Sequence, residues 1–368
     1  MKRRAFLSTT AAGAAALATS CSASQQPAEQ HPSLGKPVMM KLGTQRGPTD
    51  ARILSYVARH GVEGICGRPK ATEDRQWQLE DLLAMRELCD KHNVSLDLLD
   101  FPLTSGGIER QIFPNILLGN DPERDRDIDL VCEMIRTTAQ AGIPCLKYNM
   151  ALHPVLRTER TPGRGDAQYS TWDYDLAPDK DVPHTLAGHV SREENWERIT
   201  YFLERVIPVA EEYKIRMACH PHDPGLPPQG YQGIYRVLGD VEGLKRFVDI
   251  QKSLYHGLNL CLGTTAEMLR NPNEELHDVI RYFGNRKKIF NIHFRNIIGR
   301  RNKFQEVYPD NGDIDMMEVM RTLKEVEYPY LVMPDHVPRH PDDEGGLQAF
   351  AFSYGYIRAL LQMVEAEG

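Results

Sequence analysis

Eight short apolar runs alternate with longer segments whose apolar residues recur at helical spacing, and this alternation constrains the fold most strongly. The expected strands are residues 39–43, 62–66, 95–100, 145–149, 215–220, 258–261, 289–293 and 330–335. The expected helices are residues 49–60, 78–92, 124–142, 192–213, 241–255, 274–284, 315–327 and 346–366. Eight strand–helix pairs predict an α/β fold, a single (β/α)8 TIM barrel over residues 37–368 with long loops after strands 3 and 4.

Turn and capping residues agree with these boundaries. Ser191 to Glu194 reads as a capping box, and Gly61, Gly142 and Gly284 each follow a helical segment and precede a strand. The stretch 150–190 after the fourth strand is rich in polar and turn residues, so we interpret it as a lid or substrate loop.

The first 36 residues are expected to lie outside the barrel. Residues 1–21 have a basic start and an Ala-rich apolar run, which is the layout of a bacterial export signal. The pair Arg3-Arg4 predicts twin-arginine export, and Leu17 to Cys21 resembles a lipobox that would anchor Cys21 to lipid. A Sec signal with a chance arginine pair is the alternative. Residues 22–36 then form a polar tether, and the protein is predicted to be periplasmic or lipid-anchored.

Composition narrows the partners and the role of the thiols. The net charge of −7 and the lack of a basic run argue against nucleic acid as a partner. We expect a homo-oligomer that binds a small-molecule sugar or sugar acid and meets the membrane only through Cys21. Seven cysteines are present, and the six after Cys21 show no compact disulfide spacing, so most are predicted to be small core residues.

Polar side chains gather at the carboxyl ends of the predicted strands, where a TIM barrel places its active site. In chain order they are Gln45 and Arg46; Cys66 and Arg68; Asp100; Lys147 and Asn149; His220, His222 and Asp223; Cys261; His293 and Arg295; and Asp335 and His336. The last four strands thus offer His, Cys, His and Asp, which together suit a first-row divalent metal. Taken singly, each has a plainer reading: a histidine at a strand end is often structural, and Cys261 lies between two leucines.

Three other strand-end residues also have two interpretations. Arg295 could hold a carboxylate or phosphate through both guanidinium nitrogens, or form a surface salt bridge. Lys147 within a strand indicates a pocket, or a charge partner for Asp100 or Asp97. His222 is expected behind the metal ligands or facing solvent.

Several motifs of this chain resemble those of the mannonate dehydratase family. They are residues 220–224 (HPHDP), 260–263 (LCLG), 293–296 (HFRN), 312–316 (GDIDM) and 334–336 (PDH). That family is a TIM barrel that uses a divalent metal, usually Mn, with Fe, Co and Zn as alternatives here. The resemblance implies the metal ligands His220, Cys261, His293 and Asp335. It also implies that His336 is the catalytic histidine and that Arg295 faces the substrate.

The chain departs from the family at the expected substrate contacts. The third-strand segment reads LDFPLT at residues 99–104, and the loop after Asn149 lacks the family's aromatic residues. The family's C-terminal tyrosine has Tyr354 and Tyr356 as its nearest counterparts. We therefore expect a conserved metal chemistry with altered substrate contacts, and the predicted substrate-binding residues are Arg295, Asn149, Lys147, Asp223 and Arg157.

The predicted reaction removes the C2 proton of a mannonate-like sugar acid and expels its C3 hydroxyl, giving a 2-keto-3-deoxy sugar acid. A metal that chelates the carboxylate would stabilise the enediolate, and His336 would transfer a proton with Tyr354 or Tyr356 as its complement. A metal-dependent sugar isomerase or epimerase is the first alternative. An exported sugar-binding lipoprotein, which needs no metal-binding cysteine, is the second. A phosphate-ester metallohydrolase is weaker, because the ligand set has few carboxylates.

Overall fold

The computed structural model describes residues 35–226 and 230–368. Eight parallel strands form a closed barrel in the order β1-β12-β9-β8-β7-β4-β3-β2. These strands are β1 (Lys41–Thr44), β2 (Gly64–Gly67), β3 (Ser95–Asp100), β4 (Cys145–Asn149), β7 (Arg216–His220), β8 (His256–Cys261), β9 (Ile289–Phe294) and β12 (Leu331–Pro334). The predicted TIM barrel is confirmed, and each predicted strand matches one of these to within three residues at either end.

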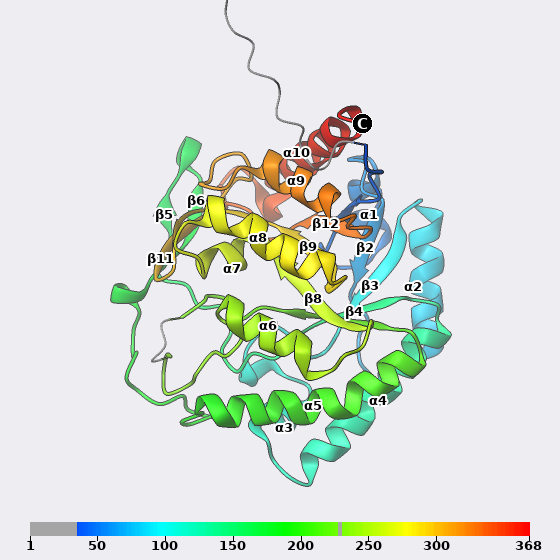
Figure 1. The fold of residues 1–368 in the computed structure, drawn as a ribbon. Helices are drawn as coiled ribbons and strands as arrows, with labels where there is room; N and C mark the ends of the chain where they lie inside the picture. The colour runs from blue at the N-terminus through cyan, green and yellow to red at the C-terminus, as the bar shows by residue number, and fades with distance from the viewer. Residues whose placement is uncertain (1–34, 227–229) are drawn as a thin grey trace, which may run out of the picture. The chain divides into compact units, whose positions relative to one another are not determined.

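Eight helices follow the barrel strands, and Figure 1 shows them arranged around the strands. They are α1 (Ala51–Ala58), α2 (Leu79–Lys91), α4 (Glu123–Gln140), α5 (Arg192–Glu212), α6 (Val241–Ile250), α8 (Pro272–Asn285), α9 (Met316–Glu325) and α10 (Leu347–Ala366). Each of them turns buried apolar residues toward the strands, as Ile199 and Phe202 of α5 do. No helix within the described residues is long and apolar enough to cross a membrane.

Two short helices and four further strands complete the fold. The helices are α3 (Pro114–Leu118) and α7 (Leu262–Glu267), and α7 begins directly after the last residue of β8. The strands are β5 (Thr161–Pro162), β6 (Gln168–Asp173), β10 (Asn296–Arg300) and β11 (Lys303–Val307). They form a separate antiparallel sheet in the order β10-β11-β6-β5. We call it the accessory sheet.

The accessory sheet corrects the expectation that the stretch 150–190 is only a loop. Two of its strands lie in that stretch, and the hairpin of β10 and β11 after the seventh barrel strand was not predicted. The hairpin has a recognisable signal, because Gly299 and Asn302 frame a turn between two runs of apolar and β-branched residues. Both residues adopt positive φ, 94° and 72°. The sheet therefore links the segment after β4 with the segment after β9.

Residues 1–34, with the predicted export signal and most of the tether, lie outside the described residues. The six cysteines after Cys21 are all buried and free, in agreement with their prediction as core residues. One of them, Cys261, lies in the cluster described below.

The predicted capping box is present at the start of α5. Ser191 Oγ accepts a hydrogen bond from the backbone N–H of Glu194 (3.1 Å), and the Glu194 carboxylate accepts one from the backbone N–H of Ser191 (2.8 Å). We expect Ser191→Ala to lower the free energy of unfolding by about 1 kcal/mol, because one backbone donor loses its partner. Urea denaturation measures the change. Ser191→Thr, which keeps the hydroxyl, should retain most of the stability, and equal loss in both variants would contradict the role of the cap.

Candidate active site

Four side chains from consecutive barrel strands meet at the carboxyl end of the barrel. They are His220 on β7, Cys261 on β8, His293 on β9 and Asp335 directly after β12, and one ligand atom of each lies within 4.8 Å of all the others. Cys261 and His293 are paired in the register of their parallel strands, so their side chains leave neighbouring positions. The structure thus brings together the four residues predicted to bind a metal.

The two histidines are held so that each presents one ring nitrogen to this metal-ligand cluster. Nδ1 of His220 donates to the carbonyl of Pro221 (2.6 Å), which leaves Nε2 free to act as a ligand. Nε2 of His293 is hydrogen-bonded to the side-chain amide of Asn259 (3.2 Å), and Nδ1 lies 3.3 Å from Asp335 Oδ1. Burial lowers the pKa of His220 to about 4 and that of His293 well below its usual value. Both rings are therefore neutral at pH 7, as metal ligation requires.

Cys261 and Asp335 complete the cluster. The Cys261 thiol lies 3.5 Å from Asp335 Oδ2 and accepts a hydrogen bond from the backbone N–H of Thr264 (3.4 Å). Burial raises the pKa of the Cys261 thiol well above its usual value. Burial also opposes ionisation of Asp335, but His336, His293 and Arg295 outweigh it and hold the Asp335 pKa well below its usual range. A divalent cation fits this set, because it would convert the buried thiol to a thiolate and bind the carboxylate and both imidazoles.

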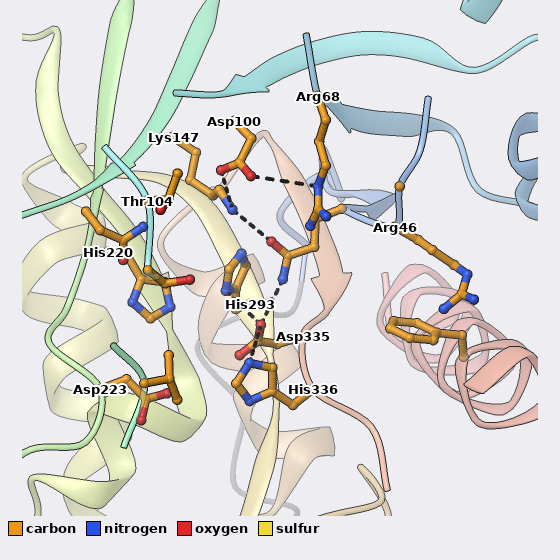
Figure 2. Close-up of a pocket in the computed structure, with 16 residues that line it drawn as sticks. Arg46, Arg68, Asp100, Thr104, Lys147, His220, Asp223, His293, Asp335 and His336 are labelled. Carbon is orange, nitrogen blue, oxygen red and sulfur yellow. Dashed lines mark hydrogen bonds and ion pairs between the residues drawn. The ribbon is translucent and has the colours of Figure 1, made fainter. Parts of the chain in front are cut away.

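A chain of polar contacts runs from the metal-ligand cluster to the opposite wall of the site (Figure 2). Gln45 donates to Asp335 Oδ1 (2.8 Å) and accepts from Lys147 Nζ (2.9 Å). Lys147 pairs with Asp100 Oδ1 (3.0 Å), and Asp100 Oδ2 lies 3.7 Å from Arg68 Nε. Lys147 is therefore both a pocket residue and the charge partner of Asp100. Gln45 fixes the orientation of Asp335.

His336 lies beside the cluster at the edge of the cavity, and a carboxylate from the accessory sheet holds its ring. Its Nδ1 lies 2.8 Å from Glu306 Oε1, and 40% of its side chain is exposed. Burial lowers the pKa of His336, but Asp335 and Glu306 more than compensate, so the pKa is raised. Glu306 belongs to β11 and was not predicted, because a single glutamate in an alternating hairpin strand resembles an ordinary surface residue. The arrangement leaves Nε2 of His336 as the atom that can exchange a proton with a substrate.

Arg295 does not face the cavity, which corrects the prediction that it contacts the substrate. Its side chain is fully buried, and Nη1 lies 3.0 Å from Asp223 Oδ2 and 2.6 Å from Glu306 Oε1. Nη2 donates to Thr264 Oγ1 (2.8 Å) and to Glu267 Oε1 (2.7 Å). The guanidinium is thus committed to protein carboxylates. We call Arg295, Arg157 and the three carboxylates of Asp223, Glu267 and Glu306 the buried ion network.

Arg157 belongs to the same network rather than to the cavity wall, which corrects its prediction as a direct substrate contact. Its Nη1 lies 2.6 Å from Asp223 Oδ1, and its Nη2 pairs with Glu306. Burial raises the pKa of Asp223, but Arg157 and Arg295 outweigh this effect and hold it well below the usual range. Asp223 itself lines the cavity, as do Asn149 and Lys147. His222 lies behind the site and is hydrogen-bonded to the carbonyl of Met150 (2.9 Å).

Neither predicted tyrosine reaches the cavity, which corrects their prediction as proton-transfer residues. Tyr354 is fully buried, and its hydroxyl is hydrogen-bonded to Thr44 Oγ1 (2.7 Å). Tyr356 packs in a stacked arrangement on Phe352, which is 42% exposed. The aromatic residue that α10 turns into the cavity is Phe350, which has no proton to give. The site therefore offers no phenol among the described residues that line it.

The central cavity has a volume of about 360 Å³ and adjoins a second cavity of about 650 Å³. His220, His293, Asp335 and His336 line the central cavity together with the tips of β1 and β2. Asp335, His336, Val155 and Phe350 line both cavities, so His336 lies where they meet. The space is large enough for a six-carbon sugar derivative beside the metal ligands.

Comparison with known proteins identifies the family. Residues 181–368, half of the chain, match the family described as D-mannonate dehydratase (UxuA). The chain belongs to the D-mannonate dehydratase family. The mannonate dehydratase of Thermotoga neapolitana is 28% identical over 312 residues, 75% of this chain and 82% of that protein. The predicted family and enzyme class, a hydro-lyase, are confirmed.

Solved structures agree with this assignment. The mannonate dehydratase of Streptococcus suis serotype 2 has a TM-score of 0.76 and 25% identity, covering 90% of this chain and 95% of that chain. A D-tagatose 3-epimerase-like protein has a TM-score of 0.56 and 16% identity, covering 89% and 99%. At that identity the second similarity extends to the fold only. The comparisons therefore favour the dehydratase over the epimerase alternative.

Glu306 should matter for turnover because it holds His336. We expect Glu306→Gln to lower kcat by about 10- to 100-fold with little change in KM, the effect typical of losing the partner that orients a functional imidazole. Glu306→Asp, which keeps the charge, should recover part of kcat. Steady-state kinetics at fixed metal content measures both. A change in KM alone, or no recovery with Asp, would contradict the positioning role.

Proposed function

We propose that this member of the D-mannonate dehydratase family dehydrates a mannonate-like sugar acid to a 2-keto-3-deoxy sugar acid. The observation that carries the proposal is the placement of His336 at the edge of the metal-ligand cluster, in a cavity that both share. Loss of water breaks the C2–H and C3–O bonds and forms a C2–C3 double bond, and the resulting enol becomes the 2-keto product. The proton taken from C2 balances the proton that the C3 hydroxyl receives as it leaves as water. A divalent metal, when bound, supplies positive charge that stabilises the anion formed when the C2 proton leaves. We take Mn as the native metal and Fe, Co or Zn as alternatives.

The residues of the chain have separate tasks in this proposal. His220, Cys261, His293 and Asp335 hold the metal, and Gln45 keeps Asp335 in orientation. His336 carries a proton on Nε2 for the departing C3 hydroxyl, because its Nδ1 is engaged by Glu306 and its pKa is raised.

In this proposal Lys147 and Asn149, which line the same cavity, donate hydrogen bonds to substrate oxygens. Lys147 has its pKa raised because the Asp100 carboxylate outweighs the effect of burial, so it stays charged. It therefore contributes positive charge rather than acting as the base.

Product analysis tests the proposal. Metal-loaded protein is incubated with D-mannonate, and the products are followed by NMR. A 2-keto-3-deoxy product with loss of one water supports dehydration. A product of unchanged mass would favour the isomerase or epimerase alternative, and no product from mannonate or related acids would contradict the proposal. His336→Asn serves as the chemical control, since it keeps a polar side chain near Glu306 but cannot act as an acid.

We also propose that the protein is exported and acts in the periplasm or on a lipid anchor. The support is the sequence of residues 1–21 alone, with Arg3-Arg4 and a lipobox-like end at Cys21. Mass spectrometry of the mature N-terminus from membrane and periplasmic fractions tests it. An N-terminus that still begins at Met1 in the cytoplasmic fraction would contradict export.

We propose further that residues 37–368 act as one catalytic domain and assemble as a homo-oligomer. The first part is supported by the eight barrel strands, which lie between Lys41 and Pro334 and close into one barrel. Sedimentation velocity of the mature protein measures the assembly state, and a monomer at micromolar concentration would contradict the second part.

A further inference from the structure

The end of the central cavity formed by β1 and β2 is rich in positive charge. Arg46 follows β1 and Arg68 follows β2, and both line the cavity with Lys147. Figure 2 shows Arg46 on the opposite side of the site from His220, with Arg68 between them. This cationic end is built from strands that contribute nothing to the metal-ligand cluster.

The charge of Arg46 has no carboxylate partner among the described residues. Its Nη2 donates to the carbonyl of Gly345 (2.6 Å), which is neutral. Its guanidinium carbon lies 4.8 Å from the centre of the Phe350 ring, which is also neutral. Its Nε is buried and has no hydrogen-bond partner. The side chain is thus held in place by groups that leave its positive charge unbalanced.

Arg68 is only weakly balanced. Its one ionic contact with a described residue is the 3.7 Å approach of Nε to Asp100, and 48% of its side chain is exposed. Asp100 is already paired more closely with Lys147, at 3.0 Å. Lys147 and Arg68 therefore share the Asp100 carboxylate, and Arg46 has no part in it.

Gly47 lies between the backbone of Arg46 and the side chain of Arg68. A Cβ at Gly47 would lie 2.9 Å from Arg68 Cδ and 3.4 Å from Arg68 Nη1. The Arg68 side chain therefore lies against the backbone of the residue that follows Arg46. Both arginines line the central cavity and have little counter-charge, so an anion that enters this side of the cavity meets positive charge from each of them.

We infer that the substrate of this enzyme carries a second anionic group, which binds to Arg46 and Arg68 at the end of the cavity distant from the metal-ligand cluster. The inference rests on the proposed function, in which the first carboxylate is taken up at the metal end. A sugar acid with a second carboxylate or with a phosphate ester at C6 has this chemistry. D-mannonate, whose C6 carries a neutral hydroxyl, lacks it.

Substrate comparison tests the inference. The metal-loaded enzyme is assayed with D-mannonate, D-mannarate (a carboxylate at both ends) and 6-phospho-D-mannonate. We expect kcat/KM for one of the two dianions to exceed that for D-mannonate by about tenfold or more, because close pairs of opposite charge add to binding. Which dianion is preferred distinguishes a second carboxylate from a phosphate. Equal or better turnover of D-mannonate would overturn the inference and leave the proposed function intact.

Variants at the two arginines provide the second arm. Arg46→Met and Arg68→Met should each lower kcat/KM for the preferred dianion by about tenfold and for D-mannonate by no more than about threefold. Arg126→Met, an arginine on α4 with 70% of its side chain exposed, is the matched control and should change neither. Equal losses on both substrates would overturn the inference, since the arginines would then hold the carboxylate that all these acids share.

Direct binding separates the two proposals. Calorimetric titration of the metal-loaded protein with D-mannarate and 6-phospho-D-mannonate needs no turnover. Tighter binding of a dianion than of D-mannonate, lost in Arg46→Met and Arg68→Met, would support the anion site even where no acid is dehydrated. Similar affinities for D-mannonate and both dianions in wild type and variants would overturn it, whatever the enzyme's activity.

Discussion

Replacing Cys261 with alanine should abolish metal binding and activity, whereas the same change at Cys219 should leave both intact. This is the expected result because Cys261 Sγ lies within 4.8 Å of the other three ligand atoms. Cys219 is equally buried, but its thiol contacts the carbonyl of His220 and is not in the cluster. Loss of an orienting partner alone costs about 10- to 100-fold, and loss of a ligand should exceed this. The two cysteines therefore form a matched pair.

The readout includes quantities other than activity. Elemental analysis should find close to one metal per wild-type chain and a large loss in Cys261→Ala and in His220→Ala. Bound metal should also stabilise the wild type, by about 2.7 kcal/mol at a concentration 100 times Kd. Thermal unfolding with and without Mn should show this shift in wild type and Cys219→Ala only. Unchanged metal content in Cys261→Ala would remove that residue from the site.

Replacing Arg295 with methionine should cost about 3–5 kcal/mol of the free energy of unfolding, the loss typical of removing one partner from a buried ion pair. The variant leaves Asp223, Glu306 and Glu267 without the cation that lies 2.6–3.0 Å from their oxygens. Burial already raises the pKa of Glu267 well above its usual value. Without the Arg295 cation, the Glu267 carboxylate must therefore take up a proton or return to water as the protein unfolds.

Guanidinium chloride denaturation measures the effect. Arg281→Met is the control. Arg281 pairs with Glu325 at 3.0 Å, and a third of its side chain is exposed. Solvent-exposed ion pairs of this kind contribute about 0–1 kcal/mol to the free energy of unfolding. Arg295→Lys keeps the charge but not the planar fork, so it should be less destabilised than the methionine variant. Similar losses for Arg281→Met and Arg295→Met would contradict the buried ion network as a major source of stability.

The barrel and its metal-ligand cluster were predictable from the sequence because they depend on local patterns. Each barrel strand is a short apolar run, and the carboxyl ends of parallel strands must meet at one end of the barrel. His220, Cys261, His293 and Asp335 therefore had to lie near one another once the strands were recognised. The family motifs then added their expected roles.

The rest of the site depended on contacts that strand patterns do not encode. Arg295 is two residues from His293 and was expected to face the cavity, yet the backbone enters β10 at Asn296 and the guanidinium meets carboxylates from three other segments. Tyr354 was assigned by sequence proximity, but it lies one helical turn beyond Phe350 on the same face of α10, where its hydroxyl meets Thr44 and only Phe350 reaches the cavity. The contact of Glu306 with His336 could not be predicted without knowing that β11 pairs with β6 and β10 in the accessory sheet.

The polar chain from Arg68 through Asp100, Lys147 and Gln45 to Asp335 makes the two ends of the cavity thermodynamically linked. An anion that draws Arg68 away from Asp100 would change the ion pair between Asp100 and Lys147. Lys147 also donates to Gln45, which orients Asp335, so the change would extend to the metal ligand. Any factor by which such an anion changes the affinity for the cation must equal the factor by which the cation changes the affinity for the anion. Metal titrations in the presence and absence of a dianion should therefore differ.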